Sequence, residues 1–396
     1  MNRILLIAGI FFVTLTSCID PYVLNLNDYE SLLVVDGLIT NEAAPYTIKL
    51  SRTFQDKDTL PVMVSKAVVT VMDKNGVVAA FREEAPGIYR SDPDLFVGET
   101  GNTYILHIKT VDGLEYESSP CYMSPVPDID SIFFTPDNAF FDNGTKEETG
   151  IRIFINTGRN DDNCKYFRWE YEEVWKFKTS YPAAYQYLGG RQVISIPVKN
   201  HVCWEYRDSK DILIHSVVSQ QTDQITGMPL KFIAPARSDR LTLQYSIRVK
   251  QYSLSKQEYE FWNNLKQVSE GGGDIFDRQP FSVTGNIRCL NRQDKKVLGY
   301  FSVSAAKQKR KYITRNDIKD LNLPNYRYPC TVVQVESTPT QSIENIYNLY
   351  TGMGYVFAYP IYTGLSLTGM AFTTKECSDC SLNGDTIKPD FWVDMP

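Results

Sequence analysis

Short stretches rich in apolar and β-branched residues recur along the first third of the chain, and several alternate with polar residues. They cover residues 32–37, 46–50, 67–72, 87–90, 104–109 and 114–117. Alternation with a period of two sends successive side chains to opposite faces of a β-strand, so each stretch is predicted to be a strand. Turn sequences separate them, including Asp73-Lys74-Asn75-Gly76 and Asp112-Gly113. About seven short strands with intervening turns predict an immunoglobulin- or fibronectin-like β-sandwich over residues 18–125.

A proline-rich segment ends this first region. Pro120, Pro125 and Pro127 fall within eight residues. Proline lacks a backbone N–H and disfavours both helix and central strand. We therefore place a domain boundary near residue 125 and expect a second domain over residues 126–396.

The clearest strand of the second domain covers residues 167–177. Its large aromatic residues share one parity, and most of its charged residues share the other: Phe167, Trp169, Tyr171, Trp175 and Phe177 against Arg168, Glu170, Glu172 and Lys176. This pattern predicts a strand with one face in the core and the other toward water. Residues 241–250 alternate in the same way.

One helix is predicted near residues 255–270. Ser255 and Glu258 have the spacing of a capping box, and Phe261, Trp262 and Leu265 then place an apolar face at helical spacing. Strand-like segments return at 283–289, 297–304 and 331–335. The fold is therefore predicted to be mostly β: the N-terminal sandwich, then a larger β-sandwich-type domain with one or two short helices.

The N-terminus has the features of an export signal. Arg3 precedes an apolar run from Ile4 to Leu15, which ends in Leu15-Thr16-Ser17-Cys18. This run is too short to cross a bilayer, which takes roughly 20 residues, but it matches a signal-peptide core. The last four residues resemble the lipobox of bacterial lipoproteins, so we expect residues 1–17 to be removed and Cys18 to carry lipid. Two or more acyl chains are enough for stable membrane anchoring.

Composition narrows the possible partners. The formal net charge is −6, and no basic cluster stands out. This charge argues against nucleic acid as a partner. Export to an oxidising compartment favours disulfides, and the candidate cysteines are Cys203, Cys289, Cys330, Cys377 and Cys380. Their pairing cannot be deduced from the spacing.

Few residues support a catalytic or metal-binding site. His201 and Cys203, joined by Cys377 and Cys380, would form a zinc-like set, but an oxidising compartment favours disulfides instead. Cys377 and Cys380 also form a CxxC pair, although no βαβ pattern surrounds it. Glu170 and Glu172 lie on one strand face about 7 Å apart, near the carboxylate separation of glycosidases, but such pairs are common on exposed strands. We expect no metal, no cofactor and no enzymatic activity.

A tyrosine-rich loop after the aromatic strand is the best candidate for a binding surface. The candidate ligand-binding residues are Trp175, at the end of that strand, and Tyr181, Tyr185 and Tyr187, which lie in the turn-rich stretch beyond it. Exposed tyrosines stack on sugars and peptides at little entropic cost. The alternative is that these rings cover the edge of the sandwich.

Several ordered motifs resemble one known family. They are the lipobox, LLVVDGLIT, VPDIDSI, YSIRVKQYSLSKQEYEFW, IFDRQP, GNIRC, VLGYF and the terminal CSDCSLNGDTIKPDFW. This set resembles the family catalogued as domain of unknown function 4249, lipoproteins of Bacteroidota, over nearly the whole mature chain. Members are often encoded beside TonB-dependent outer-membrane receptors, so the resemblance implies an accessory role in uptake or assembly. It implies no catalytic residues.

These observations lead to one preferred function and two alternatives. We expect a lipid-anchored outer-membrane protein that acts as a non-catalytic partner of a TonB-dependent receptor in nutrient capture or uptake. The membrane face stays open, with the cell surface preferred over the periplasmic side. The alternatives are a structural or adhesion lipoprotein that uses β-sandwiches as spacers, and an exported glycan hydrolase built on Glu170 or Glu172.

Overall fold

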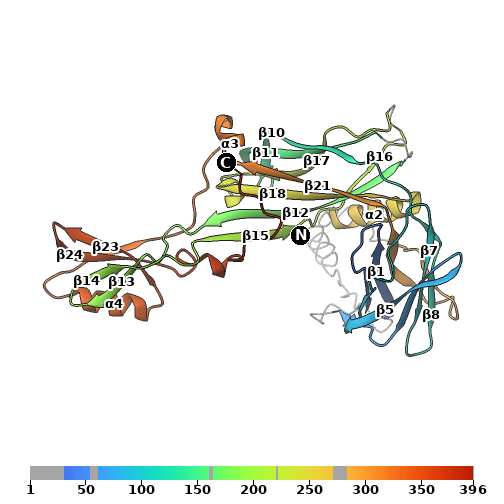
Figure 1. The fold of residues 1–396 in the computed structure, drawn as a ribbon, viewed down its shortest axis with the longest axis horizontal. Coiled ribbons are helices and arrows are strands. Elements are labelled where there is room, and N and C mark those ends of the chain that lie inside the picture. Colours follow the sequence, from blue (N-terminus) through green and yellow to red (C-terminus); the bar gives the residue numbers. More distant parts are fainter. Residues whose placement is uncertain (1–30, 54–60, 160–163, 220–221, 271–282, 396) are drawn as a thin grey trace, which may run out of the picture.

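Three parts follow one another along the long axis of the molecule (Figure 1). A computed structural model describes residues 31–53, 61–159, 164–219, 222–270 and 283–395. The N-terminal domain, with β1, β5, β7 and β8, lies at one end, and a sandwich of long strands occupies the centre. A small lobe with α4, β13, β14, β23 and β24 projects from the other end. The fold is mostly β, as predicted.

The N-terminal domain is built on one folded sheet. Its strand order is β19-β8-β7-β4-β5-β6-β2-β1-β20, with β3 paired to β2 and β9 paired to β7. The strands are β1 (Leu33–Ile39), β2 (Thr47–Arg52), β3 (Val62–Met63), β4 (Val68–Asp73), β5 (Gly76–Ala85), β6 (Ile88–Arg90), β7 (Thr103–Lys109), β8 (Glu115–Ser118), β9 (Cys121–Tyr122), β19 (Ile287–Cys289) and β20 (Val297–Val303). β4 and β5 form the hairpin that the turn at 73–76 predicts.

Two of these strands come from much later in the chain. β19 pairs with β8, and β20 runs parallel to β1, from Leu33 beside Val297 to Ile39 beside Val303. The predicted division into 18–125 and 126–396 does not describe this pairing, because residues 287–303 complete the N-terminal sheet. Gly299 makes the close approach possible: its φ is +86°, and a Cβ there would lie 1.9 Å from the carbonyl oxygen of Val35.

The central part is a two-layer sandwich. One layer has the order β10-β11-β17, and the other has β15-β12-β18-β21 with β16 paired to β12. The strands are β10 (Ile129–Phe141), β11 (Lys146–Thr157), β17 (Met228–Ile233), β12 (Tyr166–Lys178), β15 (Val202–Asp208), β16 (Leu213–Ser216), β18 (Gln244–Ser253) and β21 (Ala306–Thr314). Apolar side chains of both layers belong to one buried cluster, which also extends into the N-terminal domain. The predicted aromatic face of β12 lies in this core, where Trp169 and Phe167 are fully buried.

Helix α2 (Lys256–Glu270) lies where the N-terminal domain meets the central sandwich. It begins after Ser255, whose hydroxyl accepts a hydrogen bond from the backbone N–H of Glu258, as the capping-box spacing predicts. Phe261 packs on Tyr300 of β20. Two shorter helical segments, α3 (Arg315–Ile318) and η3 (Lys319–Leu321), follow β21, and η2 (Asp239–Leu241) precedes β18.

The distal lobe combines two distant segments, 184–196 and 333–373. The first forms the hairpin β13 (Tyr185–Gly189) and β14 (Gln192–Ser195); the second forms β22 (Val333–Glu336), α4 (Ile343–Gly352), β23 (Val356–Thr363) and β24 (Ser366–Thr373). The sheet order in the second segment is β22-β24-β23. We call the strand ends and loops that join this lobe to the sandwich, residues 177–183, 197–203, 326–332 and 374–385, the neck. The sequence interpretation did not separate this lobe from the second domain.

Candidate functional site

Two of the three tyrosines predicted to bind a ligand pack in the distal lobe, with Tyr187 in its core and Tyr185 against that core. Tyr187 is buried, donates a hydrogen bond from its hydroxyl to Glu344 Oε2 at 2.7 Å, and packs on Tyr347 at 4.8 Å between ring centroids. Tyr185 is half-buried against Phe357. The expectation that Tyr187 is exposed is therefore wrong, because its ring packs against α4.

Tyr181 lies in the neck and is half-buried, with its ring 6.4 Å from that of Tyr359. Trp175 is 2 % exposed in the central sandwich, so its ring faces the core and not the surface. Its indole N–H donates to Asp239 Oδ1 at 3.0 Å, and the Arg240 guanidinium lies 4.1 Å above its ring. These contacts fix Trp175 as part of the packing under the neck.

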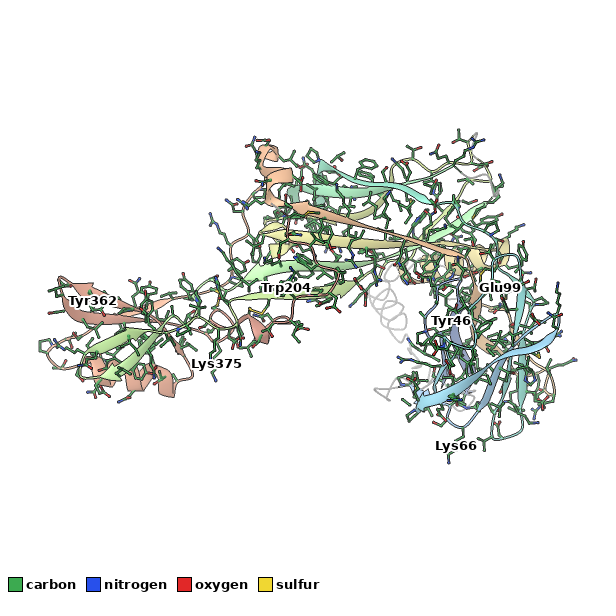
Figure 2. The ribbon with its side chains drawn as sticks, viewed as in Figure 1. Tyr46, Lys66, Glu99, Trp204, Tyr362 and Lys375 are labelled. Carbon is green, nitrogen blue, oxygen red and sulfur yellow. A yellow bond between two sulfur atoms is a disulfide. The ribbon has the colours of Figure 1, made fainter. Side chains whose placement is uncertain are left out.

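Large apolar side chains are exposed over the distal lobe. They are Leu188, Ile194, Leu349, Met353, Tyr362 and Leu365, and Leu365 is fully exposed at the turn between β23 and β24. Figure 2 shows Tyr362 on this lobe, at the end of the molecule away from the N-terminal domain. Singly exposed apolar residues are ordinary on protein surfaces, so these six become informative only together with the charge of the lobe.

The distal lobe is also poor in charge. Arg191, Glu336 and Glu344 are the only charged residues within 184–196 and 333–373. One of them, Glu344, is held by the Tyr187 hydroxyl. Depletion of charge with enrichment of tyrosine and methionine is typical of the centre of protein–protein interfaces. The low charge of 333–373 is a sequence signal that our reading of the motifs did not use.

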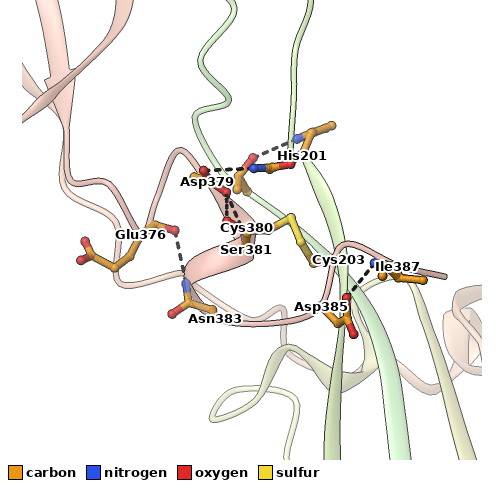
Figure 3. The surroundings of a disulfide bond; sticks show 11 residues. His201, Cys203, Glu376, Asp379, Cys380, Ser381, Asn383, Asp385 and Ile387 are labelled. Carbon is orange, nitrogen blue, oxygen red and sulfur yellow. Dashed lines mark hydrogen bonds between the residues drawn. A yellow bond between two sulfur atoms is a disulfide. The ribbon is translucent and has the colours of Figure 1, made fainter. Parts of the chain in front are cut away.

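Two disulfides fasten the neck. Cys203 on β15 is bonded to Cys380, and Cys330 is bonded to Cys377. Figure 3 shows the first bond beside His201 and Asp379. The preference for structural disulfides over a CxxC redox pair or a zinc set is confirmed, because each cysteine of the CxxC is bonded to a different partner. Cys289, the fifth disulfide candidate, is a correction: it is a free, buried cysteine on β19, where its neighbours on β8 are not cysteines.

Further hydrogen bonds order the neck around the disulfides. His201 Nδ1 lies 2.9 Å from the Thr179 hydroxyl, and the Thr179 N–H donates to the His201 carbonyl. Asp379 begins the short helix η4 (Cys380–Leu382) and accepts hydrogen bonds from the backbone N–H and hydroxyl of Ser381. These bonds, with the Ser381 hydroxyl contributing most, hold the pKa of Asp379 below its usual value. The neck is thus tied to β15 by covalent and polar contacts.

Two cavities flank the neck. The first, of about 560 Å³, has mostly apolar walls, with Ala183, Ile196, Pro197, Val356 and Leu382 among its lining. The second, of about 530 Å³, is polar, with Glu205, Arg207, Asp239, Tyr326 and Glu376 among its lining. Burial raises the pKa of Asp239, against the opposing effect of the Trp175 N–H. The neck therefore presents an apolar and a polar hollow, both framed by residues of the strand ends and the C-terminal segment.

Glu170 and Glu172 both line a cavity of about 360 Å³ on the central sandwich. Arg168 donates to Glu170 at 2.7 Å, whereas Arg248 and Arg310 donate to the two oxygens of Glu172 at 2.8 and 3.1 Å. Asp208 also lines this cavity. Both glutamates are therefore engaged by arginine.

Cys18, the expected site of lipidation, lies outside the described residues. Within the ranges that the structure describes, no helix has the length and apolar character needed to cross a bilayer. In the same ranges, no cluster of three or more His, Cys, Asp and Glu side chains is arranged to hold a metal ion.

Comparison with known proteins places the chain in a family but gives it no characterised relative. No curated protein matches it. A family model matches residues 19–310, so β22, α4, β23, β24 and the terminal CSDCSLNGDTIKPDFW motif lie beyond the matched region. Since the match covers well over half of its length, the chain belongs to the family described as domain of unknown function (DUF4249).

Proposed function

We propose that this protein is a lipid-anchored, non-catalytic partner of a TonB-dependent outer-membrane receptor, and that its distal lobe is the part that docks on the receptor. In this role it helps the receptor capture or admit its cargo. The observation that carries the proposal is the distal lobe itself, a projection with exposed apolar residues and three charged residues in its two segments. Such a surface has the composition of an interface centre.

The proposed anchor at Cys18 would lie on the side of the N-terminal domain. Ser31, the first described residue, follows Cys18 by 13 positions, and β1 begins two residues later in the N-terminal domain. An extended tether of this length reaches at most about 45 Å. A lipid on Cys18 would therefore keep the N-terminal domain near the membrane, whereas the distal lobe lies at the opposite end of the molecule (Figure 1).

The rigidity of the neck also favours docking. Both disulfides lie at the base of the lobe and join segments that are 177 and 47 residues apart in the chain. A fixed projection loses less conformational freedom on binding than a flexible one. The lobe is thus suited to hold one orientation against a partner.

Site-specific photocrosslinking tests the proposal. A photoreactive amino acid is placed at Leu365 on the distal lobe or, as a matched control, at Val111, which is 72 % exposed on the N-terminal domain. After irradiation of intact cells, the expected result is a covalent adduct with a TonB-dependent receptor from Leu365 and none from Val111. Adducts from Val111 alone, or no receptor adduct from any lobe position, would contradict the docking surface.

Substitution gives an independent measurement. Met353→Lys and Leu365→Lys place charge on the lobe, and each should weaken copurification with the receptor by about tenfold or more if it lies at the interface centre. Val111→Lys should leave copurification unchanged.

Cys18→Ala should release the protein from the membrane fraction; a variant that stays membrane-bound would refute the anchor. If the protein purifies from membranes without any receptor bound to it, a spacer or adhesion protein would be favoured instead.

A further inference from the structure

The apolar neck cavity is framed by three separate segments of the chain. Ala183, Ile196, Pro197 and Lys199 come from the segments that flank the β13–β14 hairpin on either side. Val356 begins β23. Lys375, Ser378, Asp379 and Leu382 come from the disulfide-bonded C-terminal segment. The cavity therefore exists only when the distal lobe is folded onto the neck. The disulfides at Cys377 and Cys380 hold one of its walls in place.

The size and walls of this cavity are those of a small-molecule site. Its volume of about 560 Å³ falls within the range of roughly 300–1,000 Å³ that is usual for ligand pockets. Ile196, Val356 and Leu382 provide the apolar surface of the cavity, and the Leu382 side chain is 54 % exposed. Such walls favour an aliphatic group of a ligand over water.

Two lysines give the cavity a positive edge. Lys199 and Lys375 are both exposed, and neither forms an ion pair with another residue of the described ranges. Figure 2 shows Lys375 projecting from the neck. Asp379 is the one acidic residue of the lining, and its carboxylate already accepts hydrogen bonds from Ser381 and Asn200. These bonds keep Asp379 ionised, so the lining holds two positive charges and one negative charge, a net charge of +1.

One polar group in the lining has no partner. Ser378 is 3 % exposed, and within the described structure its hydroxyl forms no hydrogen bond. Its oxygen is also closed to solvent, so Ser378 forms part of the cavity wall and does not donate a hydrogen bond to a ligand in the cavity.

We propose that the apolar neck cavity binds a small amphiphilic anion, an aliphatic monocarboxylate whose chain contacts Ile196, Val356 and Leu382 and whose carboxylate faces Lys199 and Lys375. Because the ligand contacts both the distal lobe and the neck, its binding also stabilises their packing. This site is separate from the exposed apolar residues of the lobe, and it does not depend on the receptor.

Isothermal titration with decanoate tests the site, with 1-decanol as the uncharged comparison. The protein is the chain from residue 19 onward, which contains every described residue and lacks the proposed lipid. We expect saturable binding of one decanoate and an affinity for decanol that is about 3- to 30-fold lower, since exposed charge pairs contribute modestly. No saturable binding of decanoate, or equal affinity for decanol, would overturn the proposal.

Matched variants separate this site from non-specific binding. Lys199→Gln and Lys375→Gln should each weaken decanoate binding about two- to fivefold without changing decanol binding, whereas Lys74→Gln on the N-terminal domain should change neither. Ile196→Glu should abolish binding, while Val111→Glu should not. Thermal unfolding of each variant checks that the fold is retained, and Lys375→Arg should keep wild-type affinity.

One further variant keeps the two proposals apart. Leu365→Lys, which should disrupt receptor docking, should leave decanoate binding intact. If Leu365→Lys removes decanoate binding while Ile196→Glu does not, the anion binds the exposed lobe surface and the cavity is not the site. Failure of decanoate binding in all proteins would leave the photocrosslinking of the receptor unaffected.

Discussion

Replacement of Glu258 by glutamine should make the protein more stable at neutral and alkaline pH. Glu258 lies in the first turn of α2, at the junction of the N-terminal domain and the central sandwich, and is 2 % exposed. Burial raises the pKa of its carboxyl to about 7, and the opposing effects of Ser302, Arg168 and Trp262 are smaller. The Trp262 indole N–H donates to its Oε1 at a distance of 3.4 Å.

The expected magnitude follows from the shift in this pKa. The carboxyl moves from an ordinary value of 4.5 to about 7 on folding, so the native state holds the proton more tightly than the unfolded chain. The stabilisation that this proton provides is therefore complete below about pH 4.5 and is lost as the pH rises through about 7. A shift of this size corresponds to about 3 kcal/mol of unfolding free energy between the two limits. Glutamine keeps the shape and carries no charge, so it avoids this loss.

Urea unfolding between pH 4.5 and 8.5 measures the effect. At pH 8 the Glu258→Gln variant should exceed the wild type by up to about 3 kcal/mol, and the difference should vanish toward pH 4.5. Glu260→Gln is the matched control, because Glu260 lies exposed on the same helix and pairs with Lys256 only at 3.8 Å. It should change stability by less than about 0.5 kcal/mol at every pH. A difference between Glu258→Gln and wild type that is the same at pH 5 and pH 8 would refute the reasoning.

Two further substitutions test the long-range contacts of the fold. Gly299→Ala should destabilise the protein by at least about 3 kcal/mol, because the added Cβ would meet the Val35 carbonyl oxygen. Gly354→Ala is the control: Gly354 has a nearly equal φ of +88° but nothing within 4 Å, so this change should cost only the backbone strain of about 1–2 kcal/mol. Equal effects of the two substitutions in urea unfolding would contradict this account. The double substitution Cys203→Ser with Cys380→Ser should lower the unfolding free energy by about 2–4 kcal/mol and make the neck susceptible to limited proteolysis. An unchanged cleavage pattern would show that the disulfide does not fasten the neck.

Local patterns in the sequence were sufficient for most individual elements. The alternation in residues 167–177 predicts β12, and the capping-box spacing at Ser255 predicts the start of α2. Both depend on neighbours within a few residues, so the chain itself carries the signal. The burial of Glu258 was not predicted, because a glutamate at this position of a capping box is ordinarily solvated.

The family resemblance and the likelihood of disulfides also came from sequence, but the pairing did not. Cysteine spacing leaves every pairing open, and only the fold brings Cys203 beside Cys380 across 177 positions. The same limit explains Cys289. Only Ile287–Cys289 of the predicted strand at 283–289 form β19, and this strand pairs with β8, where no cysteine faces it.

The sequence by itself determined that this is a mostly β chain with one capped helix near 255–270. The tertiary structure alone decided that residues 287–303 return to the N-terminal sheet and that 184–196 joins 333–373 in a separate lobe. The reason is physical: strand and helix periodicity is set by adjacent residues, whereas sheet partners and shared cores are set by contacts between residues far apart in the chain. Tyr187 illustrates the difference, because its burial depends on Glu344 and Tyr347, more than 150 positions away.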